Sequence, residues 1–168
     1  MIIGDGDIAK VLPDRDDYIW FASGVSNSQE TRKAEFSREK DLLFTFADDQ
    51  TKRLVYFSSL SVFYKDSPYT RHKRKMEQYA GMWPKHTIIR IGNISWGTNP
   101  HTIINHLKMK HTRGEPLEIQ DTYRYVADKE EFLYWLGMIP DWNCEINIPG
   151  KRMTVQEIVD KYVYTSGD

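Results

Sequence analysis

The chain has 168 residues, 40% of them hydrophobic, which is enough for one substantial core but too few for two full-sized domains. Lysine plus arginine total 23 and aspartate plus glutamate total 24, so the formal net charge of −1 offers no surplus of positive charge to a nucleic-acid backbone. The single cysteine, Cys144, cannot form a disulfide within the chain, and neither a basic leader nor a long apolar span is present. We therefore expect one cytoplasmic domain that binds neither nucleic acid nor membranes.

The first part of the chain predicts two buried strands with a helix between them. A short apolar segment, Met1–Ile3, leads into the glycine turn GDGDIAKVL and a short helix. The run YIWFA at 18–22 has no polar alternation, as expected of a strand covered on both faces. Apolar residues then recur at helical spacing from about 28 to 46, and RLVYFSS at 53–59 is a second buried strand.

The middle of the chain predicts a helix, a strand and a further helix. Ser67 and Pro68 favour a helix start. A serine hydroxyl can accept a hydrogen bond from an unpaired backbone N–H of the first turn, and proline fits that turn without losing a hydrogen bond. This helix should run to about Gly81, followed by the strand HTIIRIG at 86–92. The segment GTNP then places Asn99 and Pro100 at the head of a helix that reaches about Lys110.

The last third continues the alternation of strands and helices. PLEIQ and YRYVA are strand candidates, and DKEEFLYWLGMI is a helix that Asp128 caps. After CEINIPG, Thr154 and Glu157 form a capping box at the head of the final helix. This order predicts an α/β fold with a parallel sheet.

The glycine turn carries a spacing that suits a phosphate. Gly4, Gly6 and Ala9 form the pattern G-x-G-x-x-A, in which glycines let the backbone approach a pyrophosphate at a helix N-terminus. Asp5 and Asp7 place negative charge near this position, and a plain turn between strand and helix is an equal alternative. In dinucleotide-binding folds an acidic residue at the end of the second strand binds the adenosine ribose. Here the next strand after the glycine turn is already YIWFA, and no separate strand with such a residue comes before it.

A serine, a tyrosine and a lysine follow one another in an order that suits proton transfer. Tyr69 and Lys73 lie four apart and share one helix face. A phenol titrates near pH ~10 in water, and a neighbouring ammonium stabilises the phenolate. Ser59, at the end of the preceding strand, would hold a substrate oxygen against Tyr69. The three side chains together suit proton transfer coupled to hydride transfer. The alternative is an exposed tyrosine-lysine pair with no chemical role.

The segments LVYFSSLSVF, SPYTRHKRKME and IIRIGNISWG resemble the extended short-chain dehydrogenases/reductases, the NAD-dependent epimerases and dehydratases of nucleotide sugars. Weaker matches follow in GEPLEIQ, YRYVAD and EINIPGKRMTVQEIV. The resemblance implies a Rossmann-like parallel sheet with helices on both faces, NAD or NADP as cofactor, and Ser59, Tyr69 and Lys73 as the catalytic set. It implies cofactor contacts at Gly4, Gly6, Asp7, Ile8, Ala22, Ser23, Lys73 and Ile91, and substrate contacts at Ser59, Asn93 and Arg124.

The chain is shorter than this family's members. Two strands that usually stand between the glycine turn and YIWFA, and that build the adenosine pocket, are missing. We expect a single domain, 1–168, with a cofactor-binding core at about 1–97 and a reduced α/β substrate region at about 98–168. The resemblance also implies a homodimer through the helices at 28–46 and 69–83.

Three functions are compatible with these patterns. The first is an NAD(P)-dependent oxidoreductase or epimerase acting on a nucleotide sugar or similar hydroxyl or carbonyl substrate. The second is a catalytically inactive remnant of the same fold that serves in binding or assembly. The third is an α/β domain that binds another phosphorylated ligand at the glycine turn. A metal site is not expected, because His101, His106 and His111 are five apart and a helix turns by about 500° over five residues.

Overall fold

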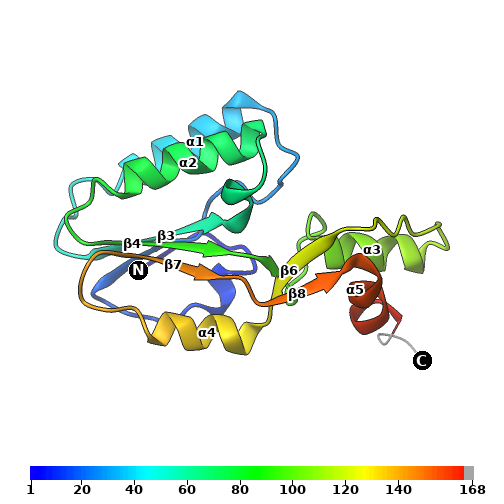
Figure 1. Ribbon diagram of the computed structural model, residues 1–168. Helices are drawn as coiled ribbons and strands as arrows, with labels where there is room; N and C mark the ends of the chain where they lie inside the picture. The colour runs from blue at the N-terminus through cyan, green and yellow to red at the C-terminus, as the bar shows by residue number, and fades with distance from the viewer. Residues whose placement is uncertain (165–168) are drawn as a thin grey trace.

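A computed structural model describes residues 1–164, which form two sheets with flanking helices (Figure 1). The larger sheet has five parallel strands in the order β1-β2-β3-β4-β7. Their bounds are β1 Ile2–Ile3, β2 Tyr18–Phe21, β3 Arg53–Ser59, β4 His86–Ile91 and β7 Cys144–Ile148. Every residue of β2 is buried, in keeping with its unbroken apolar sequence. The parallel, Rossmann-like α/β sheet with few strands is confirmed.

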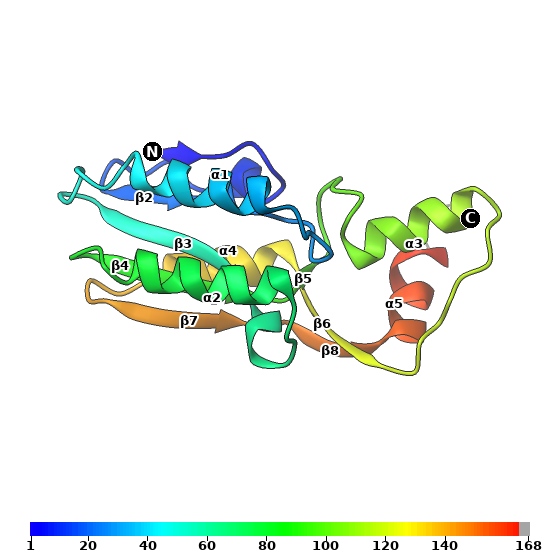
Figure 2. The same ribbon diagram turned by 90° about the horizontal axis from the view of Figure 1, so that it is seen from above.

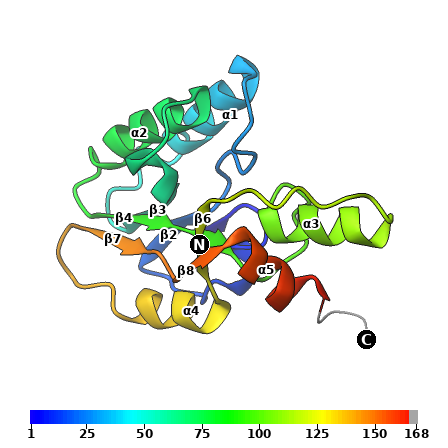
Figure 3. The same ribbon diagram turned by 45° about the vertical axis from the view of Figure 1, so that its right-hand side comes forward.

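Helices cover both faces of this sheet (Figure 3). Helices α1 (Lys33–Phe44) and α2 (Pro68–Ala80) pack on one face, where Leu43 and Met76 are fully buried. The 3₁₀ helix Ala9–Val11 and helix α4 (Lys129–Gly137) pack on the other face. Each face therefore has its own apolar core, and the loops at the strand ends remain free to form a site.

A smaller unit lies beyond the carboxyl ends of these strands (Figure 2). Its sheet has the order β5-β6-β8, with β5–β6 parallel and β6–β8 antiparallel. The bounds are β5 Asn93–Ile94, β6 Tyr123–Ala127, β8 Lys151–Thr154, α3 Ile103–Thr112 and α5 Val155–Tyr162. The two helices share a third apolar core with β6 and β8. The space between the two sheets is where a parallel α/β fold places its ligands.

The predicted helix caps are confirmed at three of the helices. The Ser67 hydroxyl accepts the amide of Thr70 at the head of α2, with Pro68 in the first turn. Asp128 accepts the amide of Glu131 at the head of α4. The capping box of Thr154 begins α5 as expected.

Two predictions of local structure are wrong. Helix α3 begins at Ile103 with Thr102 as its cap, because Asn99 accepts the amide of His101 in a local turn and does not cap the helix. The segment PLEIQ at 116–120 is no strand, since it crosses the surface without a strand partner.

Other boundaries shift, and two short strands had no signal in the sequence. Helix α1 begins at Lys33 and not near position 28, after Glu30 accepts the amides of Thr31 and Arg32. Strands β5 and β8 are too short and too polar to show a strand pattern, and only the fold of the whole chain pairs them with β6.

Candidate functional site

A cavity of about 680 Å³ lies at the carboxyl ends of β1 to β4. Its walls come from the turn after β1, the loop after β2, helices α1 and α2, the ends of β3 and β4, strand β5 and the segment that precedes α3. The walls therefore combine segments from the large sheet with segments from the smaller unit. Parallel α/β sheets bind ligands at this position.

Ser59, Tyr69 and Lys73 all line this cavity. Ser59 is the last residue of β3, Tyr69 lies in the first turn of α2, and Lys73 follows one turn later. The Lys73 Nζ lies 5.9 Å from the centre of the Tyr69 ring, and the Ser59 hydroxyl lies 2.8 Å from the Ser61 hydroxyl. The structure thus brings together the three side chains that the sequence singled out.

The phenol of Tyr69 is buried, and its pKa lies above the ordinary value. Burial is the largest cause and raises the pKa, because it disfavours the phenolate. Lys73 lowers the pKa, Glu39 raises it, and Ser59 lowers it. Burial and Glu39 together outweigh the ammonium, so Tyr69 is a protonated phenol at neutral pH.

Glu39 is a site residue that the sequence reasoning missed. It is 0% exposed, and its Oε1 accepts hydrogen bonds from Lys73 Nζ at 3.0 Å and from the Tyr56 hydroxyl at 2.7 Å. Lys73 also donates to the Tyr56 oxygen at 3.1 Å. A signal was present in the sequence, since Glu39 lies at helical spacing with Phe36 and Leu43 on the inward face of α1.

The second oxygen of Glu39 joins two further elements. It accepts the amide of Val25 at 2.7 Å and lies 2.9 Å from His72 Nε2. Burial raises the pKa of Glu39, but Lys73, His72, the Val25 amide and Tyr56 together hold it far below its usual value. Glu39 is therefore a carboxylate that ties α1, α2 and the loop after β2 to the ammonium.

The loop after β2 passes close to this ion pair at Gly24. A Cβ at this position would lie 2.5 Å from Lys73 Nζ and 2.9 Å from Glu39 Oε1. Glycine is thus needed for the loop to cover the ion pair. Gly24 was not among the residues that the sequence singled out.

The glycines of the first turn have two different roles. Gly4 has a φ of 119°, and a Cβ there would lie 2.6 Å from the carbonyl oxygen of Ala22, so this glycine allows β1 to pack against the end of β2. Gly6 borders the cavity, and a Cβ there would meet nothing within 4 Å. The helix that follows is only the 3₁₀ turn Ala9–Val11, which does not provide the helix N-terminus that the spacing predicted for an anion.

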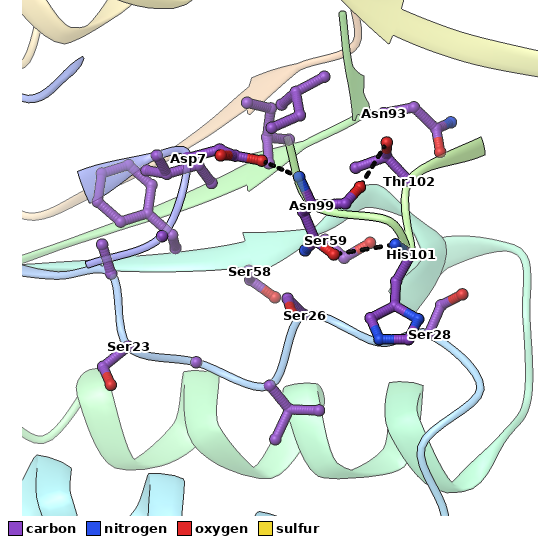
Figure 4. Close-up of a pocket in the computed structure, with 18 of the residues that line it drawn as sticks. Asp7, Ser23, Ser26, Ser28, Ser58, Ser59, Asn93, Asn99, His101 and Thr102 are labelled. Atoms are coloured by element: carbon purple, nitrogen blue, oxygen red, sulfur yellow. Dashed lines mark hydrogen bonds between the residues drawn. The ribbon is translucent and has the colours of Figure 1, made fainter. Parts of the chain in front are cut away.

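Asp7 lies in the cavity wall, but its carboxylate already has partners (Figure 4). It accepts the amides of Thr98 at 3.0 Å and Asn99 at 2.8 Å, and its backbone oxygen accepts Trp96 Nε1 at 3.2 Å. Gly97, with a φ of 88°, leaves room for this carboxylate. Asp7 therefore holds the segment before α3 against the glycine turn.

The other expected contacts divide between two cavities. Ile8, Ala22, Ser23 and Ile91 line the main cavity. Asn93 lines the main cavity and an adjoining one of about 500 Å³, and its side chain donates to the Tyr125 carbonyl at 3.0 Å. Arg124 lines only the adjoining cavity, where it donates to Thr122 and Gln120.

Several further polar side chains line the main cavity. Figure 4 shows Ser26, Ser59 and His101 gathered around one part of it. Arg38 of α1 donates to the Ser23 carbonyl at 3.2 Å and also lines this cavity. These residues follow strand ends or lie on α1, which covers the sheet. The only feature of the sequence that could have indicated them is their position relative to the predicted strands.

Within residues 1–164, no group of three or more histidine, cysteine, aspartate or glutamate side chains is placed to hold a metal ion. Among the helices of this same range, none is long and apolar enough to cross a membrane.

Several solved structures have a similar fold. WbmG from Bordetella bronchiseptica in complex with NAD matches with a TM-score of 0.72 and 14% identity, over 90% of this chain and 56% of that chain. ADP-L-glycero-D-manno-heptose-6-epimerase from Helicobacter pylori matches with a TM-score of 0.70 and 15% identity, over 90% of this chain and 59% of that chain. UDP-glucose 4-epimerase from Thermus thermophilus in complex with NAD matches with a TM-score of 0.61 and 16% identity, over 90% of this chain and 62% of that chain.

The chain shares the fold of these three enzymes. It spans between 56% and 62% of the length of the three structures. No protein-family model matches the sequence, and no curated protein matches it. At this level of identity the similarity establishes the fold, and the residues of the cavity must carry the argument about function.

Proposed function

We propose that the chain is an NAD(P)-dependent oxidoreductase or epimerase that acts on a hydroxyl or carbonyl group of a nucleotide sugar. The observation that carries this proposal is the meeting of Ser59, Tyr69 and Lys73 in one cavity at the carboxyl ends of the parallel strands. The fold supports it, since two of the similar structures were solved with NAD. The single free cysteine suits a reducing compartment such as the cytoplasm.

The residues around the cavity fit a nicotinamide nucleoside. Lys73 has three N–H donors, of which Glu39 and Tyr56 take two, so one remains for a ribose hydroxyl. Ala22 and Ile91 add apolar wall to the same cavity. A flat ring with a polar edge finds both apolar contact and hydrogen-bonding groups here.

The chain's own residues handle the proton. When bound, the nicotinamide ring would supply or accept the hydride. Tyr69, protonated at neutral pH, would donate its proton to a carbonyl oxygen during reduction and take it back during oxidation. Ser59 would orient that oxygen, and Lys73 would stabilise the phenolate as the proton leaves. Burial of Tyr69 keeps this exchange away from bulk water.

A second candidate function is binding or assembly without catalysis. The observation that favours it is the buried carboxylate of Glu39, which opposes the effect of Lys73 on the pKa of Tyr69. A phenol whose pKa is raised is harder to deprotonate, so less phenolate is present to act as the base for oxidation. In this function the same cavity would bind a nucleotide and would turn nothing over.

The test is turnover of UDP-galactose, UDP-glucose and ADP-L-glycero-D-manno-heptose in the presence of NAD, with epimers separated by chromatography. We expect Tyr69→Phe to lower the rate by about 10²–10⁴-fold. Tyr79→Phe is the matched control, because Tyr79 lies on the same helix and contacts Phe44 outside both cavities. A Tyr69→Phe variant as active as the unaltered chain contradicts the mechanism, and NADH binding without any turnover favours the second candidate.

A homodimer through α1 and α2 belongs to this proposal. Phe44, the last residue of α1, and Met82, just after α2, have exposed fractions of 40% and 70%. Apolar side chains in this position suit a surface that a second copy covers.

A further inference from the structure

We infer that the cavity recognises only the nicotinamide mononucleotide half of the cofactor, and that residues 1–164 build no site for the adenosine half. The inference rests on the proposed function and names the part of the ligand that the site recognises. Three observations carry it: the position of β1 in the sheet, the composition of the cavity wall on that side, and the groups that line the opposite side.

The strand that would build an adenosine pocket is absent from the described residues. In dinucleotide-binding folds, an acidic residue about 20 positions after the glycine turn, at the end of the next strand, binds the adenosine ribose. Here β1 is the edge strand, and its only neighbour, β2, lies toward the centre of the sheet. Residues 4–17 separate the two strands and contain only the 3₁₀ turn Ala9–Val11. Within residues 1–164, no strand end therefore lies on the adenosine side of β1.

The cavity wall on the β1 side has no aromatic ring, and its carboxylates are those of Asp5 and Asp7 in the glycine turn. Lining residues from this part of the chain end at Lys10, and the next one in sequence is Ala22. The acidic residues between them, Asp14, Asp16 and Asp17, lie outside the cavity. Asp17 pairs with Arg15 at 2.7 Å. The Asp7 carboxylate already accepts the amides of Thr98 and Asn99, and no aromatic ring from this part of the chain can stack on adenine, so this half of a dinucleotide gains little from binding.

The other side of the cavity is equipped for a nucleoside and one phosphate. The aromatic rings in its wall, Phe57, Tyr69 and His101, all come from segments after β2. Arg38 of α1 lies 3.4 Å from the Ser23 hydroxyl, and Lys10, at the border with the β1 side, brings a second positive charge to the same cavity. Gly6 also lines the cavity, and a Cβ there would meet nothing within 4 Å, so its backbone is open to a ligand. Nicotinamide ring, ribose and a single phosphate therefore have partners, and the second nucleotide has none.

The test compares the affinities of NADH and reduced nicotinamide mononucleotide, measured by nicotinamide fluorescence on the full chain. We expect the two dissociation constants to agree within about threefold, a difference smaller than the contribution of one good contact. AMP and ADP-ribose, each at about 100 times the NADH dissociation constant, should fail to displace the reduced mononucleotide. The inference is overturned if NADH binds more than about tenfold tighter than the reduced mononucleotide, or if AMP displaces the mononucleotide. Either result leaves the proposed function standing.

Variants add a second readout. Lys10→Ala should lower the affinities for NADH and for the reduced mononucleotide by the same factor, because Lys10 would contact the phosphate that both ligands contain. Asp16→Asn, at an exposed position outside the cavity, should change neither affinity. Selective loss of NADH affinity in either variant would reveal an adenosine contact and overturn the inference. If neither nucleotide binds at millimolar concentration, the proposed function falls and this inference falls with it.

Discussion

The carboxylate of Glu39 and the ammonium of Lys73 form an ion pair of 3.0 Å whose side chains are 0% and 3% exposed. Water stabilises neither charge, so each depends on the other. Glu39 also accepts hydrogen bonds from Tyr56 and Val25, and Lys73 donates one to the Tyr56 oxygen. The pair fixes the ammonium at the wall of the cavity, where it acts on Tyr69. It is therefore a structural support and an electrostatic component of the candidate site together.

Breaking this pair should destabilise the chain strongly. Glu39→Gln leaves the Lys73 charge buried without its counter-charge, and we expect a loss of about 3–5 kcal/mol in the free energy of unfolding, measured by urea denaturation. Asp41→Asn on the same helix is the control, because its side chain is 71% exposed and its removal should change stability by less than about 0.5 kcal/mol. An unchanged urea midpoint for Glu39→Gln would show that the charges are solvated.

Removing both charges tests whether the unpaired Lys73 charge, and not the loss of the ion pair itself, destabilises Glu39→Gln. Glu39→Met combined with Lys73→Met replaces the ion pair with apolar volume, so the double variant should lose less stability than Glu39→Gln alone. Urea denaturation measures both variants under the same conditions. A double variant less stable than Glu39→Gln would mean that the hydrogen bonds from Tyr56 and Val25, and not the ion pair, dominate the stability of the cluster.

The depressed pKa of Glu39 predicts how stability changes with acidity. The carboxylate is more acidic in the folded chain than in the unfolded chain, so its contribution is complete above the unfolded value of about 4.3 and decreases as the pH falls below that value. Between pH 7 and about pH 3, the unaltered chain should lose more free energy of unfolding than Glu39→Gln. Parallel pH profiles for the two proteins would contradict this assignment.

The close approach of Gly24 predicts an effect on ligand binding. Gly24→Ala places a methyl group against Lys73 Nζ, the flexible end of its side chain, so the ammonium must move away from the position that suits a ribose. We expect NADH affinity to fall about tenfold, which corresponds to the loss of one good hydrogen bond to a charged group. Gly137→Ala, where a Cβ meets nothing within 4 Å, is the control that should leave affinity unchanged. Equal affinity in the two variants would exclude a contact between Lys73 and the ligand.

The proposed dimer predicts a dependence on Met82. Met82→Lys places a charge on the surface formed by α1 and α2, and should convert a dimer into a monomer in light-scattering measurements of molar mass. Met138→Lys is the matched control, since Met138 has an exposed fraction of 57% and follows α4 on the opposite face of the sheet. A monomeric unaltered chain at high concentration would contradict the dimer.

The buried strands and the helix with Tyr69 and Lys73 were predictable because each has a strong local signal. Strand β2 is an unbroken apolar run, and Ser67 with Pro68 begins α2 as expected. Together these signals placed Ser59 at a strand end one short loop before the tyrosine. The order of elements along the chain was then sufficient to predict that the three side chains meet.

Tertiary contacts decided what the sequence did not show. Glu39 looks like one of many charged residues on a helix, and only the packing of α1 against α2 makes it the partner of Lys73. The same holds for Gly24 and Asp7, whose partners Lys73 and Asn99 are distant in sequence. Strand β8 pairs with β6 although its sequence, KRMT, has no strand pattern.

The central claim is that a nicotinamide ring binds beside Tyr69 with its ribose on Lys73. A crystal structure of the chain soaked with NADH tests this most directly. We expect difference density for the nicotinamide ring against the Tyr69 wall and a ribose hydroxyl within hydrogen-bonding distance of Lys73 Nζ. An empty cavity at saturating NADH, or a nicotinamide ring bound elsewhere, would contradict the account.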